Sequence, residues 1–413
     1  MPKTRILKSF SSLKRSVDIR VLVRSIYIPS QMRVILQDFL GLSQKPESDH
    51  EHLKAAMKWL CRAQDITGTG GCSASYRFDS GWAQPYPETT GYIISTFLRY
   101  AGFSKDDSYL TRAKQMGDWE IEIQLPSGAV RGGSGVNPYP IVFNTGMVIL
   151  GWTDLYNRTR EEKYLNAAVR AANWLSDIID EDGKWSRYVY NDIPHAYHSR
   201  VSWSLLEVYK ATSVRKYYEV AEKNIKWVLS NVKGNDWIDG MGFSGKEDPF
   251  THTIAYTLRG LLECGCIFEG EMKDLTHQVV VRIAEKLMLK YELNKKHPNA
   301  TPGHLSGRFD SNWKSDKSFS CLTGNAQIAI IWLRLFQIYN DARFLNSALK
   351  ILDLLKGHQN IKTRNEGIRG AIGGSYPIWG DYMTYAYPNW AVKFFADALM
   401  IQENVMNELD TDK

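Results

Sequence analysis

A dense group of polar side chains lies between residues 188 and 200 of the 413-residue chain. It contains the phenols Tyr188 and Tyr190, the imidazoles His195 and His198, and the guanidinium of Arg200. Removing the C5 proton of a uronic acid requires a base, a proton donor and a group that neutralises the carboxylate. We expect His198 to act as the base, Tyr188 or Tyr190 as the donor and Arg200 as the clamp. A loop packed by aromatic rings and capping histidines is the alternative.

Two carboxylates precede or open expected helices. Glu88 follows Pro85 and Pro87, and Asp248 stands directly before Pro249. A glycoside hydrolase needs two carboxyl groups that face each other across one bond. Carboxylates also suit the first turn of a helix, whose free N–H groups carry partial positive charge. Asp248, followed by a proline at the first helical position, would be a good cap by itself.

Further candidate residues stand in glycine-rich loops or at helix starts. His252 and Tyr382 join the candidate catalytic groups. Guanidinium groups suit an anionic sugar, and indole rings stack against sugar faces. For each tryptophan, packing of the loop is an alternative of equal weight. The candidate substrate contacts are Trp82, Arg131, Asn144, Trp185, Arg187, Trp237, Arg308, Trp313, Arg369, Tyr376, Tyr385 and Asn389.

The elements that would position these residues recur from about residue 52 to residue 400. An amphipathic helix, a glycine-rich loop and an apolar helix follow one another six times. The amphipathic helices are expected over 53–63, 109–121, 164–179, 217–229, 275–289 and 344–355, and the apolar helices from about residues 90, 145, 199, 251, 323 and 389. Six pairs favour a closed double ring whose inner wall is the apolar set, although an open superhelix would have a similar period. The loops would then meet in one bowl.

This pattern resembles the (α/α)6 toroids, which include six-hairpin glycosidases, uronate lyases, glucuronyl C5-epimerases, terpene cyclases and prenyltransferases. Segments 87–92 and 387–395 are similar to parts of toroid proteins associated with surface-polysaccharide assembly. The resemblance implies an all-α fold with a catalytic (α/α)6 toroid over 51–405, between a basic arm at 1–50 and a tail at 406–413. The sequence has no DxDD or DDxxD run and no convincing Asp/Cys/His zinc set, which favours carbohydrate over isoprenoid chemistry.

Charge and cysteine usage limit the partners and the compartment. The net charge is +6, and residues 1–33 carry eight basic side chains against one acidic side chain. We expect a solvated arm, or peripheral contact with an anionic membrane, and no nucleic acid. Five cysteines without framework spacing, and no signal-like or membrane-spanning segment, favour the cytoplasm. No nucleotide or zinc motif is present, so no cofactor or metal is expected.

Together these features predict an enzyme that acts on a uronic-acid-containing poly- or oligosaccharide in surface-polysaccharide metabolism. The reaction would begin with C5 proton abstraction and end as elimination by a lyase or inversion by an epimerase. A glycoside hydrolase that uses Glu88 and Asp248 is one alternative. A glycan-binding or assembly protein without catalytic activity is the other.

Overall fold

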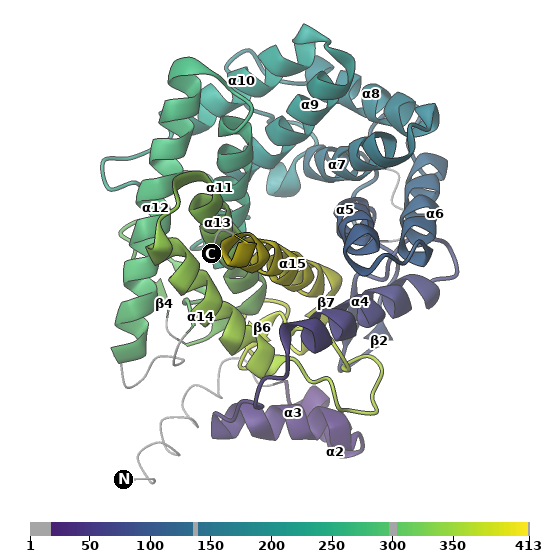
Figure 1. Ribbon diagram of the computed structural model, residues 1–413, viewed down its shortest axis with the longest axis vertical. Helices are drawn as coiled ribbons and strands as arrows, with labels where there is room; N and C mark the ends of the chain where they lie inside the picture. The colour runs from purple at the N-terminus through teal and green to yellow at the C-terminus, as the bar shows by residue number, and fades with distance from the viewer. Residues whose placement is uncertain (1–17, 135–138, 297–303, 317, 412–413) are drawn as a thin grey trace.

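Twelve helices of the computed structural model form two concentric rings (Figure 1). The structure describes residues 18–134, 139–296, 304–316 and 318–411. The outer helices are α4 (Asp49–Asp65), α6 (Ser108–Glu122), α8 (Glu162–Asp177), α10 (Arg215–Ser230), α12 (Gly270–Lys296) and α14 (Ala342–His358). The inner helices are α5 (Pro87–Ser104), α7 (Val142–Thr159), α9 (Ser199–Thr212), α11 (Thr251–Gly265), α13 (Leu322–Tyr339) and α15 (Asn389–Thr411). The expected all-α (α/α)6 toroid is therefore confirmed, with each inner helix beginning within a few residues of its expected start.

The ring closes between its last inner helix and its first helices. Helix α15 packs against both α4 and α5. At this seam the Asp49 carboxylate accepts hydrogen bonds from Lys356 and Gln402, whose side chains are almost fully buried. The closed double ring is thus observed rather than the open superhelix. It explains why the inner helices lack a polar stripe facing bulk solvent, because other helices surround them, and their charged side chains point into a cavity along the axis of the ring.

Glycines allow neighbouring inner helices to approach closely. A Cβ atom on Gly91 of α5 would lie 2.5 Å from the Cα of Val148 on α7. A Cβ on Gly151 of α7 would in turn collide with the carbonyl oxygen of Gly91. Such distances leave no room for a side chain in a close-packed interior. These two glycines therefore set the spacing of α5 and α7, which carry part of the site described below.

Short strands join the loops at the end where the inner helices begin. Strand β1 (Ser75–Arg77) lies between β2 (Gly81–Trp82) and β7 (Ala386–Pro388), so the first loop of the ring pairs with the last. The other strands form two-stranded pairs, β3 (Arg308–Phe309) with β4 (Ser315–Asp316) and β5 (Ser320–Cys321) with β6 (Ser375–Tyr376).

Two further helices, α2 (Ile19–Ile26) and α3 (Pro29–Leu40), lie beside this loop end (Figure 1). Gln31 donates a hydrogen bond to the carbonyl oxygen of Phe78, and Asp38 accepts one from the backbone N–H of Ile378 at 2.7 Å. The second half of the expected arm is therefore docked on the toroid rather than solvated. Residues 1–17 lie outside the described residues. The first part of the expected tail, residues 406–411, continues α15.

Within the described ranges, no helix has both the length and the apolar character needed to span a bilayer.

Candidate active site

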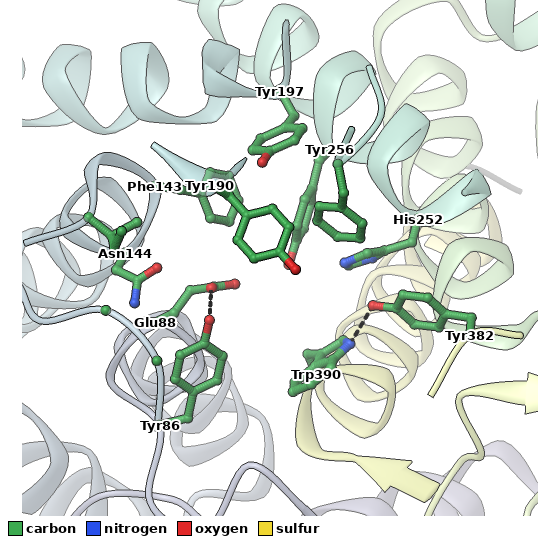
Figure 2. A pocket seen from close by; sticks show the side chains of 14 residues that line it. Tyr86, Glu88, Phe143, Asn144, Tyr190, Tyr197, His252, Tyr256, Tyr382 and Trp390 are labelled. Atoms are coloured by element: carbon green, nitrogen blue, oxygen red, sulfur yellow. Dashed lines mark hydrogen bonds between the residues drawn. The ribbon is translucent and has the colours of Figure 1, made fainter. Parts of the chain in front are cut away.

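A cavity of about 440 Å³ opens where the inner helices begin (Figure 2). Helices α5, α7, α11 and α15 contribute their first turns to it, and the preceding loops supply the rim. It is lined by Tyr86, Glu88, Gly132, Gly133, Ile141, Phe143, Asn144, Tyr190, Tyr197, Phe243, His252, Tyr256, Tyr382 and Trp390. The toroid therefore gathers side chains that lie up to three hundred residues apart into one hollow, as the sequence pattern predicted.

Glu88 is the one carboxyl group among the described residues that line the cavity. It is the second residue of α5, directly after Pro87. The Tyr86 hydroxyl donates a hydrogen bond to Glu88 Oε2 at 2.5 Å. Burial raises the pKa of Glu88 to about 7, against the opposing effects of this hydrogen bond and of the Arg200 charge. Near neutral pH, Glu88 therefore exists in both its acidic and its basic form, as a proton-transfer group requires.

His252 lies across the cavity from Glu88 (Figure 2). The Gln327 side-chain amide donates to His252 Nδ1 at 2.6 Å. Burial and the nearby Arg200 charge lower the pKa of His252 to about 3, so the ring is neutral. Because Nδ1 accepts a hydrogen bond, the proton of the neutral ring belongs on Nε2. His252 can therefore donate a hydrogen bond to a sugar oxygen but is a weak base.

Aromatic rings form most of the remaining wall. The ring of Phe143 lies 5.0 Å from that of Tyr256, which lies 4.2 Å from the His252 ring. Trp390 Nε1 donates to the Tyr382 hydroxyl at 2.8 Å and so fixes both rings. Such flat apolar faces with hydroxyl groups at their edges suit the C–H faces of a sugar. No lysine or arginine of the described residues lines the cavity.

Five of the expected site residues line this cavity: Glu88, Asn144, Tyr190, His252 and Tyr382. Three of them come from inner helices, Glu88 from α5, Asn144 from α7 and His252 from α11, and the other two, Tyr190 and Tyr382, come from loops. Tyr190 stands at the rim with 55% of its surface exposed, and the other four lie deeper.

The expected base, His198, does not line the cavity and is buried in the protein interior. It is 1% exposed, has no hydrogen-bond partner at either ring nitrogen, and packs against the rings of Trp185 and Phe143. Burial holds its pKa well below the usual value. His195 is also enclosed, since its two ring nitrogens face the carbonyl oxygens of Gly242 and Tyr190 at 2.9 and 2.7 Å. Neither imidazole has a route to a sugar in the cavity.

Arg200 and Tyr188 also lie outside the cavity lining. The Arg200 guanidinium sits behind the wall, 4.8 Å from the centre of the Tyr256 ring. Tyr188 is half exposed, has a backbone φ of 59°, and packs against Trp174. The groups expected to act together around residue 190 therefore do not converge. Tyr190 lies at the cavity rim, Arg200 lies behind the cavity wall, and the two histidines are buried in the interior.

The expected substrate contacts outside the lining mostly pack or brace the loops. Trp185 is buried, and its Nε1 donates a hydrogen bond to the carbonyl oxygen of Leu175. The rings of Trp237 and Trp313 pack together with their centres 5.2 Å apart. The side-chain amide of Asn389 donates a hydrogen bond to the carbonyl oxygen of Ser73 in the first loop. The expected residues that do not line the cavity are Trp82, Arg131, Trp185, Arg187, Trp237, Arg308, Trp313, Arg369, Tyr376, Tyr385 and Asn389. These tryptophans pack against other residues of the protein and do not line the cavity.

Asp248 does not act as the expected helix cap. Helix α11 begins at Thr251, and its N-cap residue is Phe250. Pro249 therefore precedes the helix instead of occupying its first position. Asp248 is exposed and contributes nothing to the cavity lining. The expected pairing of Glu88 with Asp248 as two facing carboxylates is not formed.

Several lining residues were not expected from the sequence: Tyr86, Phe143, Tyr197, Phe243, Tyr256 and Trp390. A positional signal existed for two of them. Phe143 and Trp390 are each the second residue of an inner helix, as are Glu88 and His252. Tyr256 follows His252 by four residues and so shares its helix face.

The described part of the chain contains no cluster of three or more His, Cys, Asp or Glu side chains arranged to hold an ion. The buried thiol of Cys321 packs in a cluster with Tyr382, which lines the cavity, and burial raises the pKa of this thiol to about 12.

Solved structures with the same architecture come from several enzyme types. An unsaturated glucuronyl hydrolase from Bacillus sp. GL1 aligns with a TM-score of 0.69 and 15% identity over 87% of this chain and 97% of its own. A cellobiose 2-epimerase from Bacillus thermoamylovorans B4167 aligns with a TM-score of 0.68 and 13% identity over 86% and 98%. A polysaccharide lyase aligns with a TM-score of 0.64 and 12% identity over 87% and 99%. At these identities the alignments establish the toroid fold.

Fold and site together define a carbohydrate-active enzyme of the (α/α)6 toroid class. Residues 50–358 match the family model described as β-L-arabinofuranosidase, GH127 catalytic domain, and the chain belongs to this family. A comparison with curated proteins found no significant match.

Proposed function

We propose that this protein is a glycoside hydrolase in which Glu88 is the general acid. The observation that carries the proposal is the state of Glu88, which is the one carboxyl among the described residues that line the aromatic hollow and has a pKa raised to about 7. Glycosidic oxygens are poor leaving groups until they are protonated, and a carboxyl of raised pKa is the usual donor. Membership of a glycosidase family supports the same reaction class.

In the proposed reaction, Glu88 gives its proton to the glycosidic oxygen while the bond from that oxygen to the anomeric carbon breaks. The leaving sugar departs as a neutral alcohol, and the positive charge that develops at the anomeric carbon faces the Glu88 carboxylate and aromatic rings. A water molecule then adds to the anomeric carbon and loses a proton to Glu88, which restores the acid. The Tyr86 hydroxyl stabilises the carboxylate between these steps.

The lining favours a neutral sugar. His252 Nε2–H, the phenols and the Asn144 amide offer hydrogen bonds to hydroxyl groups, but no cationic side chain of the described residues reaches into the hollow. A uronate carboxylate would lose its hydration there without gaining a counter-charge. Because the family is described by its β-L-arabinofuranosidase activity, β-L-arabinofuranosides are the first substrates to test.

C5 proton abstraction from a uronic acid, by a lyase or an epimerase, is the second candidate. The opposed positions of Glu88 and His252 favour it, because two groups on opposite faces of a ring could remove and return a proton (Figure 2). The lack of a cation in the lining and the low basicity of His252 count against it.

The experiment that tests the proposal offers the purified protein a panel of β-L-arabinofuranosides, other neutral glycosides and uronate polymers. We expect new reducing ends from a neutral glycoside. Ultraviolet absorbance of a C4–C5 double bond would instead identify a lyase, and solvent deuterium at C5 without that absorbance would identify an epimerase. Either result overturns the proposed hydrolysis. Glycan binding without any turnover would identify a binding or assembly protein.

We propose further that the enzyme works on a surface glycan at the cytoplasmic face of an anionic membrane. Four solvent-facing residues of α2 and its C-cap, Ile19, Val23, Ile26 and Tyr27, are apolar and 50–81% exposed at helical spacing. Leu36 and Leu40 of α3 and Leu42 just after it are also exposed, by 51–63%. Single exposed apolar residues are common, but a contiguous stripe marks an interaction surface. All five cysteines are unpaired, which supports a reducing compartment.

Charge beside the stripe supports a lipid surface as its partner. Arg20 and Arg24 flank the stripe on α2 and are exposed. The preceding seventeen residues contain no acidic side chain, and their five basic residues are Lys3, Arg5, Lys8, Lys14 and Arg15. Apolar side chains flanked by basic ones are the composition of helices that lie in the interface of anionic bilayers.

A further inference from the structure

A second cavity, of about 280 Å³, lies deeper along the axis of the toroid. Five inner helices line it, each with residues that follow its first turn, except for Arg200 near the start of α9. Tyr92 belongs to this cavity and Tyr256 to the candidate active site, and their hydroxyl oxygens lie 3.4 Å apart. The two hollows are therefore separated by a single layer of aromatic rings.

Arg200 is the charged group at the inner end of this cavity. It is 3% exposed and forms no ion pair within the described part of the chain. Its Nε lies 3.4 Å from the sulfur of Met147, and its guanidinium lies 4.8 Å from the ring centre of Tyr256 and 5.7 Å from that of Phe394. Aromatic faces attract a cation, but they replace only part of the lost hydration. A buried guanidinium without a carboxylate is costly unless an anion joins it.

Two of the three acidic groups that line this cavity already have other partners. Asp397 pairs with Lys393 at 2.7 Å and with Arg99 at 3.0 Å. Glu207 pairs with Lys210 at 2.9 Å. Overall, the lining contains five basic and three acidic side chains. The cavity therefore carries an excess of positive charge.

The ionisation of neighbouring groups agrees with this excess. Burial, together with the positive charges of Arg99 and Arg200, lowers the pKa of Lys393 to about 7. Asp154 is the one lining carboxylate that forms no ion pair within the described residues. Burial raises its pKa and so favours its uncharged form. An anion placed among these groups would favour the charged form of Lys393 and give Arg200 a partner.

Solvent can reach the cavity at its other end. The side chains of Lys210 and Arg99 stand there with 55% and 44% of their surface exposed. Partly exposed cations at the mouth and a buried cation at the inner end attract an anion along one path.

We propose that this axial cavity binds a small anion, a phosphate or a carboxylate, between Arg200 and Lys393. Both anions can accept two hydrogen bonds from a guanidinium and one from an ammonium group. The site is separate from the candidate active site, so this proposal does not depend on the reaction proposed above.

The bound anion would also act on Glu88 if Glu88 has the role proposed above. The Arg200 charge holds the pKa of Glu88 below the value that burial alone would give. An anion that pairs with Arg200 cancels part of this effect and raises the pKa of Glu88. The pH at which hydrolysis declines would then increase with anion concentration.

The test is calorimetric titration of the full-length protein with inorganic phosphate and, separately, with acetate, at constant ionic strength set by chloride. We expect saturable binding of at least one of the two, and the response to each distinguishes a phosphate site from a carboxylate site. Arg200→Met should weaken that binding at least about tenfold, because it removes charged hydrogen bonds. Arg369→Met is the matched control, since Arg369 is paired with Glu366 outside both cavities, and it should bind like the wild type.

Stability measurements provide a second readout. Phosphate or acetate should raise the Tm of the wild type and leave that of Arg200→Met unchanged, because only the wild type gains the binding energy. In anion-free buffer, Arg200→Met should be at least as stable as the wild type, since an apolar side chain replaces an unpaired buried charge. If Arg200→Met fails to fold, Lys393→Met gives the same comparison. Absence of binding to the wild type, or unchanged binding by a folded Arg200→Met, would overturn the proposal, whatever the outcome of the activity assays.

Discussion

Glu88 combines three properties that suit a proton-transfer group. It stands at the second position of an inner helix, it lines the aromatic hollow, and burial raises its pKa to about 7. The helix N-terminus favours the ionised form, as does the Tyr86 hydroxyl. Burial opposes both. The balance leaves a group that can give a proton and take one back near neutral pH.

Glu88→Gln tests this role directly. The amide keeps the shape of the side chain but cannot transfer a proton, so kcat should fall by roughly a hundredfold or more. Because the substitution also removes a buried ionisable group, Tm at pH 8 should be unchanged or higher. The control is Glu122→Gln, which alters an exposed carboxylate of α6. Wild-type turnover of neutral glycosides by Glu88→Gln would exclude Glu88 as the acid.

Tyr86→Phe should shift the pH dependence. The hydroxyl of Tyr86 stabilises the ionised form of Glu88, so its removal raises the pKa of Glu88 above about 7. The reaction needs the protonated acid, and activity of the wild type should therefore decline as pH rises through that pKa. In Tyr86→Phe the decline should occur at higher pH. A decline at the same or a lower pH would contradict this account of the Glu88 environment.

Helix pairs set the distances on which the site depends. Glu88 belongs to α5 and Asn144 to α7, and the contact of these two helices passes through Gly91 and Gly151. Where no side chain intervenes, the backbones themselves make the contact. The width of the hollow on this side is thus fixed by two residues that do not line it.

Gly151→Ala should therefore disturb both stability and site. The added Cβ collides with the carbonyl oxygen of Gly91, which a backbone shift must relieve, and overpacking of this kind costs about 1–3 kcal/mol. Tm should fall. Gly102→Ala is the control, since Gly102 lies on α5 with open space around its Cα, and alanine there should stabilise the helix slightly. Equal Tm values for the two variants would show that the helices can separate freely.

The exposed stripe of α2 makes a separate prediction. Val23→Asp combined with Tyr27→Asp should reduce sedimentation with vesicles that contain phosphatidylserine, because both changes remove apolar contact and add charge that the membrane repels. Binding of the wild type should weaken with salt and be lost on phosphatidylcholine vesicles.

The control for this variant is Val214→Asp, which changes an exposed valine far from α2 in the sequence. A large loss of Tm in the double variant, with no vesicle binding by the wild type, would show that the stripe packs against protein instead of lipid. That outcome would contradict the membrane proposal.

The molecule as a whole depends on closure of the ring. Asp49 begins α4 and holds Lys356 of α14 and Gln402 of α15 at the seam. Only a closed ring brings the last inner helix beside the first and sets Trp390 opposite Asn144 in one hollow. Closure is therefore a condition for the site as well as for the fold.

Asp49→Ala should weaken this seam. It leaves the ammonium of Lys356 and the amide of Gln402 with fewer partners in a mostly buried place, and the free energy of unfolding should fall by about 1–3 kcal/mol. Asp353→Ala is the matched control, because Asp353 also pairs with Lys356 but is 67% exposed. Denaturant titration measures both. A loss no larger for Asp49→Ala than for Asp353→Ala would show that the seam adds nothing.

Much of the fold was predictable because its signal is local and repeated. An outer helix must show one face to bulk solvent and an inner helix none, so the alternation of the two types indicated six hairpins and located the helix starts. The position of Glu88 in the first turn of α5 followed from the prolines before it. His252 and Asn144 could be selected because they stand at comparable positions in other hairpins.

The sequence determined the ring and the end of it that holds the polar side chains, because amphipathic period and turn residues act over a few positions. Only the tertiary structure decided which of those side chains meet. His198 precedes its helix in a short 3-10 turn and points into the packed interior, whereas His252 lies within its helix and faces the hollow. That difference depends on how each helix is rotated against its neighbours, and those neighbours come from distant parts of the chain.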